Sequence, residues 1–152
     1  MDIQLHDNEL RMLIKALRSP LHRYIIAIID NHNTYLDFYE WLKNNSPRPV
    51  HEINITGNRY REIIEPLKLL GNEVALIPDF DWLFIKGNDD IAISINLKRD
   101  FLAARNIKII CCMQPGNLHK FPRFMNDFWS FRSLELDFTD YWSPNHINPP
   151  TP

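Results

Sequence analysis

Three aspartates stand where strands of a predicted parallel sheet end. Asp30 follows the apolar run Tyr24–Ile29, and Asp79 and Asp81 follow the shorter run Val74–Ile77. The carboxyl ends of parallel strands share one edge of a sheet, so these side chains are candidates for a common site. Because Mg²⁺ prefers carboxylate ligands, one hypothesis is a magnesium-dependent phosphotransfer or phosphohydrolase domain that uses all three. Aspartates at strand ends also form turns and cap helices, and the sequence favours that structural role.

The junction between the first predicted strand and the next helix lacks a phosphate-binding loop. From Arg23 to Lys43 the chain reads RYIIAIIDNHNTYLDFYEWLK, which contains no glycine and has its only lysine at the far end. A phosphate cradle needs glycines that let successive backbone N–H groups turn toward one anion, and it needs a lysine and a hydroxyl for the terminal phosphates and the metal. The sequence therefore predicts a domain that has lost phosphate binding at this point, and no cofactor is expected.

Other common catalytic patterns are missing from the sequence. The six histidines are scattered, with no pair at the i, i+4 spacing of a zinc-binding helix. No serine stands in a Gly-x-Ser-x-Gly elbow. No Glu-x-Lys tripeptide follows Pro78 and Asp79, although a Pro-Asp nuclease requires one. Cys111 and Cys112 are adjacent in an apolar run, where they cannot form an ordinary disulfide, so we interpret them as buried core residues.

Helical and strand-like apolar patterns alternate about five times along the chain. Each crossover is long enough to be right-handed, which indicates a three-layer α/β domain with a mainly parallel sheet of about five strands. The first strand is expected in the middle of the sheet, the second in a more exposed position and the last at an edge. The predicted strands are Tyr24–Ile29, Val50–Ile55, Val74–Ile77, Ile107–Met113 and Leu134–Phe138.

Capping residues predict where the helices between these strands begin. The expected starts are Asp7, Asn33 or Thr34, Asn58, Asp89 or Asp90, and a short helix over Leu118–Phe124. The helix from Asp89 or Asp90 is expected to run to about Arg105. Residues 1–140 are predicted to form a single α/β domain, and residues 141–152, rich in proline and asparagine, a loose surface tail.

The composition is that of an ordinary globular domain. The chain has 152 residues, of which 45% are apolar and 24% charged, enough to build a core without disulfides or metals. A net charge of -2 argues against a general nucleic-acid binder, although Lys120, Arg123 and Arg132 leave a nucleic-acid-contacting adaptor as a further hypothesis. No apolar stretch approaches the roughly 18 residues of a membrane span and no signal-peptide pattern opens the chain, so we expect a cytoplasmic protein.

Two segments combine arginine with polar or aromatic neighbours. INLKRDFLAARNIKIICCM carries Asn96 and Arg99, and NDFWSFRSLELDF places Arg132 close to Trp129 and Phe131. An arginine among aromatic rings can stack on them and present its guanidinium group to a carboxylate or phosphate. The residues alone favour an internal ion pair over a contact with a partner for both arginines. The candidate internal partners of Arg132 are Asp127, Asp100 and Asp79.

Together the two segments resemble a diverged NTPase-like module of bacterial multidomain signalling and defence proteins. That module is related to STAND and AAA-type ATPases, is often joined to tetratricopeptide repeats, and has the pattern L-N-x-x-R-D-x-L, an apolar strand, P-D-F-W-S-W-R-S and an F-E-F-like strand. The resemblance extends from about Glu9 to Phe138. The chain departs from the pattern at Asn126, where the module usually has proline, and at Phe131, where it has tryptophan.

The resemblance implies a degenerate P-loop NTPase-like fold in which Asp79–Trp82 holds the acidic position after the third strand, and Arg99 and Arg132 match two recurrent arginines. The interpretation we favour is a non-catalytic interaction or regulatory module of a bacterial signalling or antiphage-defence system. It is expected to contact a protein partner or other domains of a larger assembly and is able to oligomerise; neither nucleic acid nor a membrane is expected as its partner. The candidate interaction residues are Asp30, Asp79, Asp81, Arg99, Trp129 and Arg132.

Overall fold

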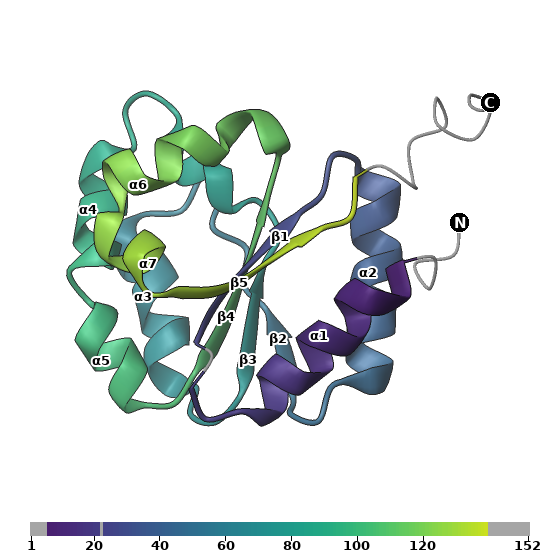
Figure 1. Cartoon of the computed structure of the whole chain (residues 1–152). Helices are drawn as coiled ribbons and strands as arrows, with labels where there is room; N and C mark the ends of the chain where they lie inside the picture. Colours follow the sequence, from purple (N-terminus) through teal and green to yellow (C-terminus); the bar gives the residue numbers. More distant parts are fainter. Residues whose placement is uncertain (1–5, 22, 140–152) are drawn as a thin grey trace.

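A parallel sheet of five strands forms the middle layer of the protein (Figure 1). The structure is a computed structural model that describes residues 6–21 and 23–139. The strand order is β2-β3-β4-β1-β5, and every neighbouring pair runs parallel. The strands are β1 (Tyr24–Ile28), β2 (Val50–Glu52), β3 (Val74–Ile77), β4 (Lys108–Met113) and β5 (Arg132–Asp137). The predicted α/β class with a parallel sheet of about five strands is confirmed.

Helices cover both faces of the sheet and complete the three layers (Figure 1). α1 and α2 pack on one face, and the helices from α3 to α7 pack on the other. The α-helices are α1 (Asp7–Arg18), α2 (His32–Asn45), α3 (Tyr60–Leu69), α4 (Asp89–Asn96), α5 (Arg99–Ala104), α6 (Phe121–Phe124) and α7 (Asn126–Ser130). Two 3-10 helices, η2 (Phe80–Phe84) and η3 (Pro115–Lys120), follow β3 and β4.

The alternation of side chains along each strand fills two separate cores. Ile26 of β1 and Cys111 of β4 face the layer with α3 to α7, whereas Ile25 and Cys112 face α1 and α2. Because both faces of the sheet are covered, β1 and β4 are apolar at consecutive positions instead of alternate ones. The two cysteines are free and buried, as predicted, and burial raises the pKa of both thiols.

The first strand lies one place away from its predicted position. β4 is the middle strand, and β1 lies between β4 and the edge strand β5. An interior strand is buried on both faces wherever it stands, so the apolar run did not distinguish these two places. The exposure predicted for the second strand is confirmed, because β2 is an edge strand with half-buried residues. The edge position predicted for the last strand is also confirmed.

The α2 helix begins at His32, earlier than the prediction from Asn33 or Thr34 as its cap. The cap is Asn31, whose side chain accepts a hydrogen bond from the Thr34 backbone N–H at 2.8 Å. Asparagine and threonine are both good caps, and only the geometry of the turn selects between them. The predicted tail, 141–152, lies outside the described residues.

The single helix predicted from Asp89 or Asp90 to about Arg105 is divided into α4 and α5. At the break, the Lys98 backbone N–H donates to the Ile95 carbonyl oxygen at 2.9 Å, an i to i+3 bond that tightens the turn and interrupts the helix. The helix α7 was not predicted from the sequence. Both differences concern the same contact between α4 and α7, which is described with the candidate site.

Lys108 opens the middle strand with a side chain that is fully buried. Its ammonium group donates a hydrogen bond to the carbonyl oxygen of Ser19 at the C-terminal end of α1, where the helix dipole favours a positive charge. Burial is the main cause that lowers the pKa of Lys108 to about 8, and the guanidinium groups of Arg48 and Arg23 act in the same direction. The folded state therefore carries an unfavourable buried charge at neutral pH.

We expect the free energy of unfolding of the wild type, measured relative to a Lys108→Met variant, to rise by about 1 kcal/mol between about pH 7 and pH 9. The unfolded chain keeps the ordinary lysine pKa of 10.5, so above about pH 8 it binds more protons than the folded chain and stability rises with pH. Urea unfolding at a series of pH values measures this difference. Other titrating groups cancel because both proteins contain them, and a difference that does not change with pH would contradict a buried ammonium group.

Candidate functional site

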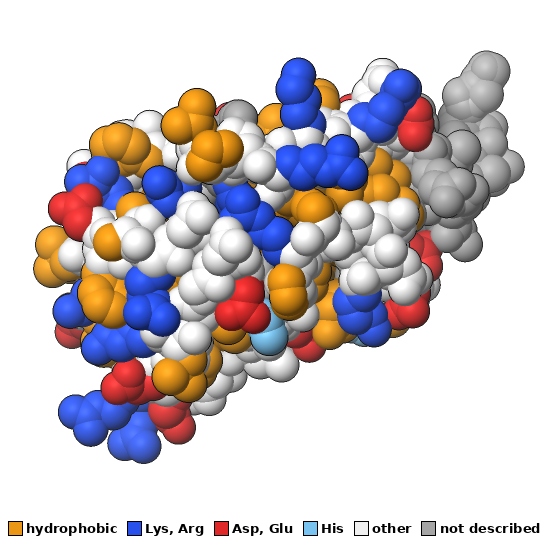
Figure 2. Space-filling model, turned by 90° about the horizontal axis from the view of Figure 1, so that it is seen from below, with side chains coloured by type: hydrophobic (Ala, Val, Ile, Leu, Met, Phe, Trp, Pro, Cys, Tyr) orange, Lys and Arg blue, Asp and Glu red, His pale blue; other side chains and the backbone are white. Residues whose placement is uncertain are grey.

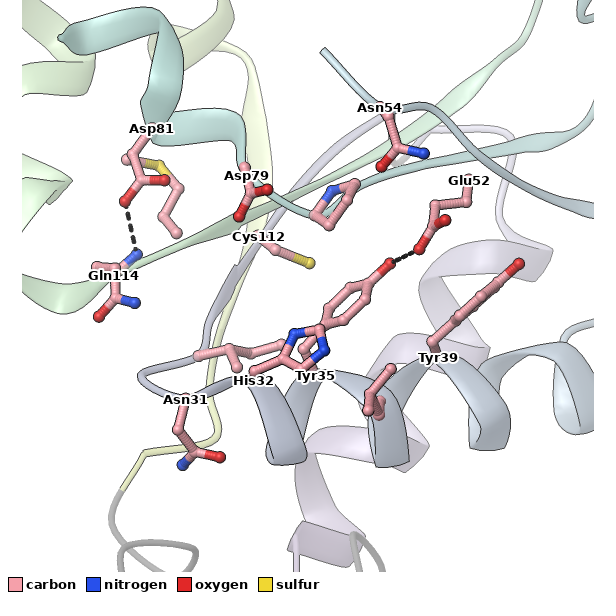
Figure 3. A pocket seen from close by; sticks show the side chains of 14 residues that line it. Asn31, His32, Tyr35, Tyr39, Glu52, Asn54, Asp79, Asp81, Cys112 and Gln114 are labelled. Carbon is pink, nitrogen blue, oxygen red and sulfur yellow. Dashed lines mark hydrogen bonds between the residues drawn. The ribbon is translucent and has the colours of Figure 1, made fainter. Parts of the chain in front are cut away.

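A pocket of about 480 Å³ opens at the carboxyl edge of the sheet (Figure 3). Its walls come from α2, from the end of β2 and the residues after it, and from the ends of β1, β3 and β4. The chain leaves β1 toward one face of the sheet and leaves β3 toward the other. A crevice between such diverging connections is where α/β sheets bind their ligands.

The turn between β1 and α2 has no backbone cradle for a phosphate. Asn31 is extended, and its side chain takes up the Thr34 N–H, one of the free donors at the start of the helix. Phosphate nests are built from successive backbone N–H groups and use left-handed positions that favour glycine. The described residues with positive φ all lie outside this turn and are Gly57, Asn72, Gly87 and Asn106. The turn thus has the kind of backbone that its glycine-free sequence predicts.

Tyr35 of α2 forms the inner wall of the pocket (Figure 3). Its hydroxyl group donates a hydrogen bond to the carboxylate of Glu52 at the end of β2, and its side chain is buried. Burial, and then the hydrogen bond to Glu52, raise the pKa of Tyr35 well above its ordinary value. The ring stacks between those of His32 and Tyr39, with centroid distances of 6.3 and 6.1 Å. An aromatic surface therefore stands close to where α2 begins.

The two aspartates after β3 both line the pocket but have different surroundings. Asp81 accepts hydrogen bonds from the Gln114 backbone N–H at 3.1 Å and from the Asn117 side chain at 2.8 Å, so it fastens η2 to the segment after β4. Asp79 is exposed, and its carboxylate has no hydrogen-bond or ion-pair partner among the described residues. Asp81 is thus mainly structural, whereas Asp79 is available to a ligand.

Asp30 does not join these two aspartates. It is not among the residues that line the pocket, and its carboxylate accepts a hydrogen bond from the neighbouring Asn31 side chain at 3.1 Å. Within residues 6–21 and 23–139, no group of three or more His, Cys, Asp or Glu side chains is placed to hold a metal ion. The hypothesis that three aspartates converge on Mg²⁺ is therefore wrong for this geometry, because Asp30 turns to its own helix cap.

The other candidates, Arg99, Trp129 and Arg132, lie near the opposite edge of the sheet. Arg132 is paired with Tyr24 at the start of β1 in the β1/β5 register, and the Tyr24 hydroxyl group donates to the Arg99 carbonyl oxygen at 3.2 Å. On the face seen from this side, Lys and Arg side chains lie among hydrophobic ones (Figure 2). The six candidate residues therefore do not form one site.

Arg132 is held inside the domain. Its guanidinium group lies 3.7 Å from the centre of the Trp129 ring, donates to the Trp129 carbonyl oxygen at 2.8 Å and pairs with Glu135 at 2.9 Å. The predicted internal role is confirmed, but none of the three predicted aspartates is the partner. Because the Nε and Nη1 atoms of Arg132 already have partners within the domain, Arg132 adds little to the nucleic-acid hypothesis, which stays a prediction.

Asn96 and Arg99, both in the segment INLKRDFLAARNIKIICCM, contact the segment NDFWSFRSLELDF. The Asn96 side-chain oxygen accepts hydrogen bonds from the Asp127 and Phe128 backbone N–H groups at 3.0 and 3.1 Å, which caps the start of α7. The Arg99 guanidinium group lies 4.1 Å from the centre of the Phe131 ring and pairs with the exposed Asp100. The two segments therefore pack against each other, and the contact has a structural explanation.

The residues that build the pocket were largely missed by reasoning from the sequence. Tyr35, Tyr39 and Glu52 are not among the candidate residues that the sequence pattern singles out. A signal was present, since Tyr35 lies one helical turn after the residue that caps α2, in the region where a nucleotide-binding protein places its phosphates. A polar hydroxyl on an otherwise apolar helix face needs a partner, and that need points to a carboxylate.

Comparison with known proteins identifies the fold. No family model matches the chain, and no curated protein matches it either. Two solved structures from Aeropyrum pernix are similar with a TM-score of 0.52 each: the ORC1 protein in complex with DNA, at 15% identity, and the ORC2 protein in ADPNP-ADP complexes, at 12% identity. Both similarities cover 90% of this chain. They cover 45% of the ORC1 chain and 47% of the ORC2 chain, so this chain spans about half the length of each.

The chain has a P-loop NTPase-like fold. At this level of identity the likeness establishes the arrangement of the sheet and helices, and the activity of the two ORC proteins is not transferred with it. The P-loop NTPase-like fold expected from the resemblance is confirmed, and the family that the resemblance names stays a prediction. Every helix in the described part of the chain is too short or too polar to cross a bilayer.

Proposed function

We propose that the chain is a non-catalytic, NTPase-like interaction module. It keeps the α/β scaffold of a P-loop NTPase-like fold, has lost phosphate binding, and works by contacting a protein partner or other domains of a larger assembly. The observation that carries this proposal is the β1–α2 junction, where a side-chain cap and a tyrosine stand in place of a phosphate-binding loop.

The charge of the pocket supports the same conclusion. Among the described residues that line it, the carboxylates are those of Glu52, Asp79 and Asp81, and there is neither lysine nor arginine. A triphosphate placed here would meet three negative charges in a partly buried site, where like charges repel more strongly than in water. The ORC2 structure was solved with ADPNP and ADP, whereas the strand ends of this chain carry these carboxylates.

The biological setting of the module is inferred from the resemblance carried by the segments INLKRD and DFWSFRS. We place it in the cytoplasm of a bacterium, as part of a signalling or antiphage-defence system. The contact between those segments supports their being one folding unit, because Asn96 of the first caps the helix of the second. The neighbouring part of such an assembly is the expected partner.

Nucleotide titration tests this proposal. We expect MgATP and MgADP at about 1 mM to leave the unfolding temperature unchanged, and no phosphate to be released from MgATP. A ligand present at 100 times its Kd would stabilise the fold by about 2.7 kcal/mol, so even a Kd near 10 μM would be detected. Stabilisation by MgATP together with turnover would overturn the proposal.

A further inference from the structure

We infer that the pocket at the carboxyl edge receives a basic side chain, arginine or lysine, from a peptide segment of a partner protein. This inference rests on the proposed function and names the chemistry of the partner. It starts from the three carboxylates of Glu52, Asp79 and Asp81, which come from β2, from the second residue after β3 and from η2. Among the described residues none of them is paired with a lysine or arginine.

The hydrogen bonds of these carboxylates leave negative charge facing the cavity. Glu52 accepts from the Tyr35 hydroxyl group and Asp81 from Gln114 and Asn117, which are all neutral donors. Neutral donors satisfy lone pairs but do not balance a charge. A cation that enters the pocket would therefore gain the exposed carboxylate of Asp79 and the partly buried carboxylates of Glu52 and Asp81, none of which forms an ion pair among the described residues.

The side chain of Cys112, which belongs to the core below α1 and α2, forms the apolar floor of the pocket. It is 2% exposed, it lines the pocket between these carboxylates, and it has no hydrogen-bond partner among the residues that the structure describes (Figure 3). Burial is the main cause that raises the pKa of this thiol; Cys111 and then the carboxylates of Asp79, Asp81 and Glu52 act in the same direction. The carboxylates therefore border an apolar floor.

The aromatic wall formed by His32, Tyr35 and Tyr39 fits a cation that carries an alkyl chain or a planar group. Tyr35 stacks with His32 and Tyr39 at interplanar angles of 24° and 23°, so a row of parallel rings borders the carboxylates. Ring faces attract ammonium and guanidinium groups, and arginine in particular stacks on them. The volume of about 480 Å³ is in the range of sites that hold a group of this size.

A second hollow favours a peptide over a free amine. It has a volume of about 310 Å³ and shares Asp79 and Asp81 with the first, so the two are adjacent. Its remaining wall includes Trp82 and Ile85, and the Ile85 side chain is 54% exposed. Lys120 also lines this hollow, which makes it unsuited to a second cation. The pair of hollows therefore fits a segment in which an apolar residue stands next to arginine or lysine.

Calorimetric titration with short peptides tests the inference. The probes are acetyl-Gly-Leu-Arg-Leu-Gly-amide, the same peptide with neutral citrulline in place of arginine, and the small amine agmatine. We expect the arginine peptide to bind with a Kd below about 1 mM and the other two at least about 10-fold more weakly, a difference of about 1.4 kcal/mol. Equal binding of the citrulline peptide would overturn the cation site, and agmatine binding as well as the peptide would overturn the peptide partner.

Variants of the pocket separate this inference from effects on folding. Glu52→Gln keeps an acceptor for the Tyr35 hydroxyl group, and Asp79→Asn alters an exposed side chain, so both proteins are expected to fold. Each should weaken the arginine peptide by at least about 5-fold. Glu40→Gln, on the same helix as Tyr35 but outside the pocket, should leave the affinity unchanged.

The two proposals fail in different ways. If no peptide binds and MgATP does not bind, the cation site is wrong and the non-catalytic module still stands. If MgATP binds and is hydrolysed, the proposed function fails and the cation site fails with it. If Glu52→Gln and Asp79→Asn bind the arginine peptide as well as the wild type does, the peptide binds elsewhere and the site is wrong.

Discussion

Replacing Phe128 with alanine is expected to lower the free energy of unfolding by about 3–5 kcal/mol. Phe128 belongs to the segment DFWSFR, is 1% exposed, and stacks on the Tyr24 ring at the start of β1 with a centroid distance of 4.3 Å. Removing the ring takes away this contact and leaves a cavity between α7 and the sheet, which the surrounding core can close only in part. Urea unfolding followed by circular dichroism measures the loss.

The same segment provides a matched control. Phe131 is 56% exposed and contacts the Arg99 guanidinium group, so Phe131→Ala should cost about 1 kcal/mol or less. If Phe128→Ala does not fold, Phe128→Leu keeps much of the volume and should cost about 1–2 kcal/mol. Equal effects of Phe128→Ala and Phe131→Ala would contradict the docking of α7 on β1.

Replacing Asn96 with alanine is expected to cost about 2 kcal/mol. The side chain is 7% exposed and accepts from two backbone N–H groups at the start of α7, those of Asp127 and Phe128. Alanine leaves both donors without this partner, and the Phe128 donor is buried, so water cannot easily replace the lost bond. Thermal and urea unfolding of the variant measure the cost.

Asn126 is the control for this second prediction, because it is exposed and lies at the start of the same helix. Asn126→Ala should change the free energy of unfolding by about 0.5 kcal/mol or less. An Asn96→Ala variant as stable as Asn126→Ala would mean that the cap does not hold α7. Both predictions concern the contact that joins the two segments on which the NTPase-like resemblance rests.

These contacts explain why the two segments were informative as a sequence pattern. Asn96 caps α7, Arg99 stacks on Phe131, and Arg132 stacks on Trp129. These three residues of the pattern thus each have an aromatic or backbone partner within the domain. At these positions the pattern describes how α4, α5 and α7 pack.

The fold was predictable because its strongest signals are local. β1, β3 and β4 are buried on both faces, so they read as continuous apolar runs, and the alternation with helices required a parallel sheet. The strand order was not predictable in the same way. An interior strand has the same composition next to an edge strand as in the middle, and β1 was placed one position too far inward for that reason.

The candidate site was only partly predictable because its residues meet through tertiary structure. Asp79 and Asp81 were found from their place after a strand, but Glu52 enters the pocket only because β2 pairs with β3. Asp30 follows a strand in the same manner and yet turns to its helix cap. A residue that follows a strand therefore lies at the carboxyl edge of the sheet. The turn that follows the strand decides where the side chain of that residue points.

The central claim is that a P-loop NTPase-like scaffold presents an acidic, aromatic pocket where such proteins hold phosphate. The most direct test is to map backbone amide signals by NMR while MgATP and the arginine peptide are added to separate samples at about 1 mM. The account predicts that the peptide shifts the signals of His32, Asn54 and Gln114, which line the pocket, and that MgATP leaves them in place. Shifts of these signals with MgATP, and none with the peptide, would contradict it.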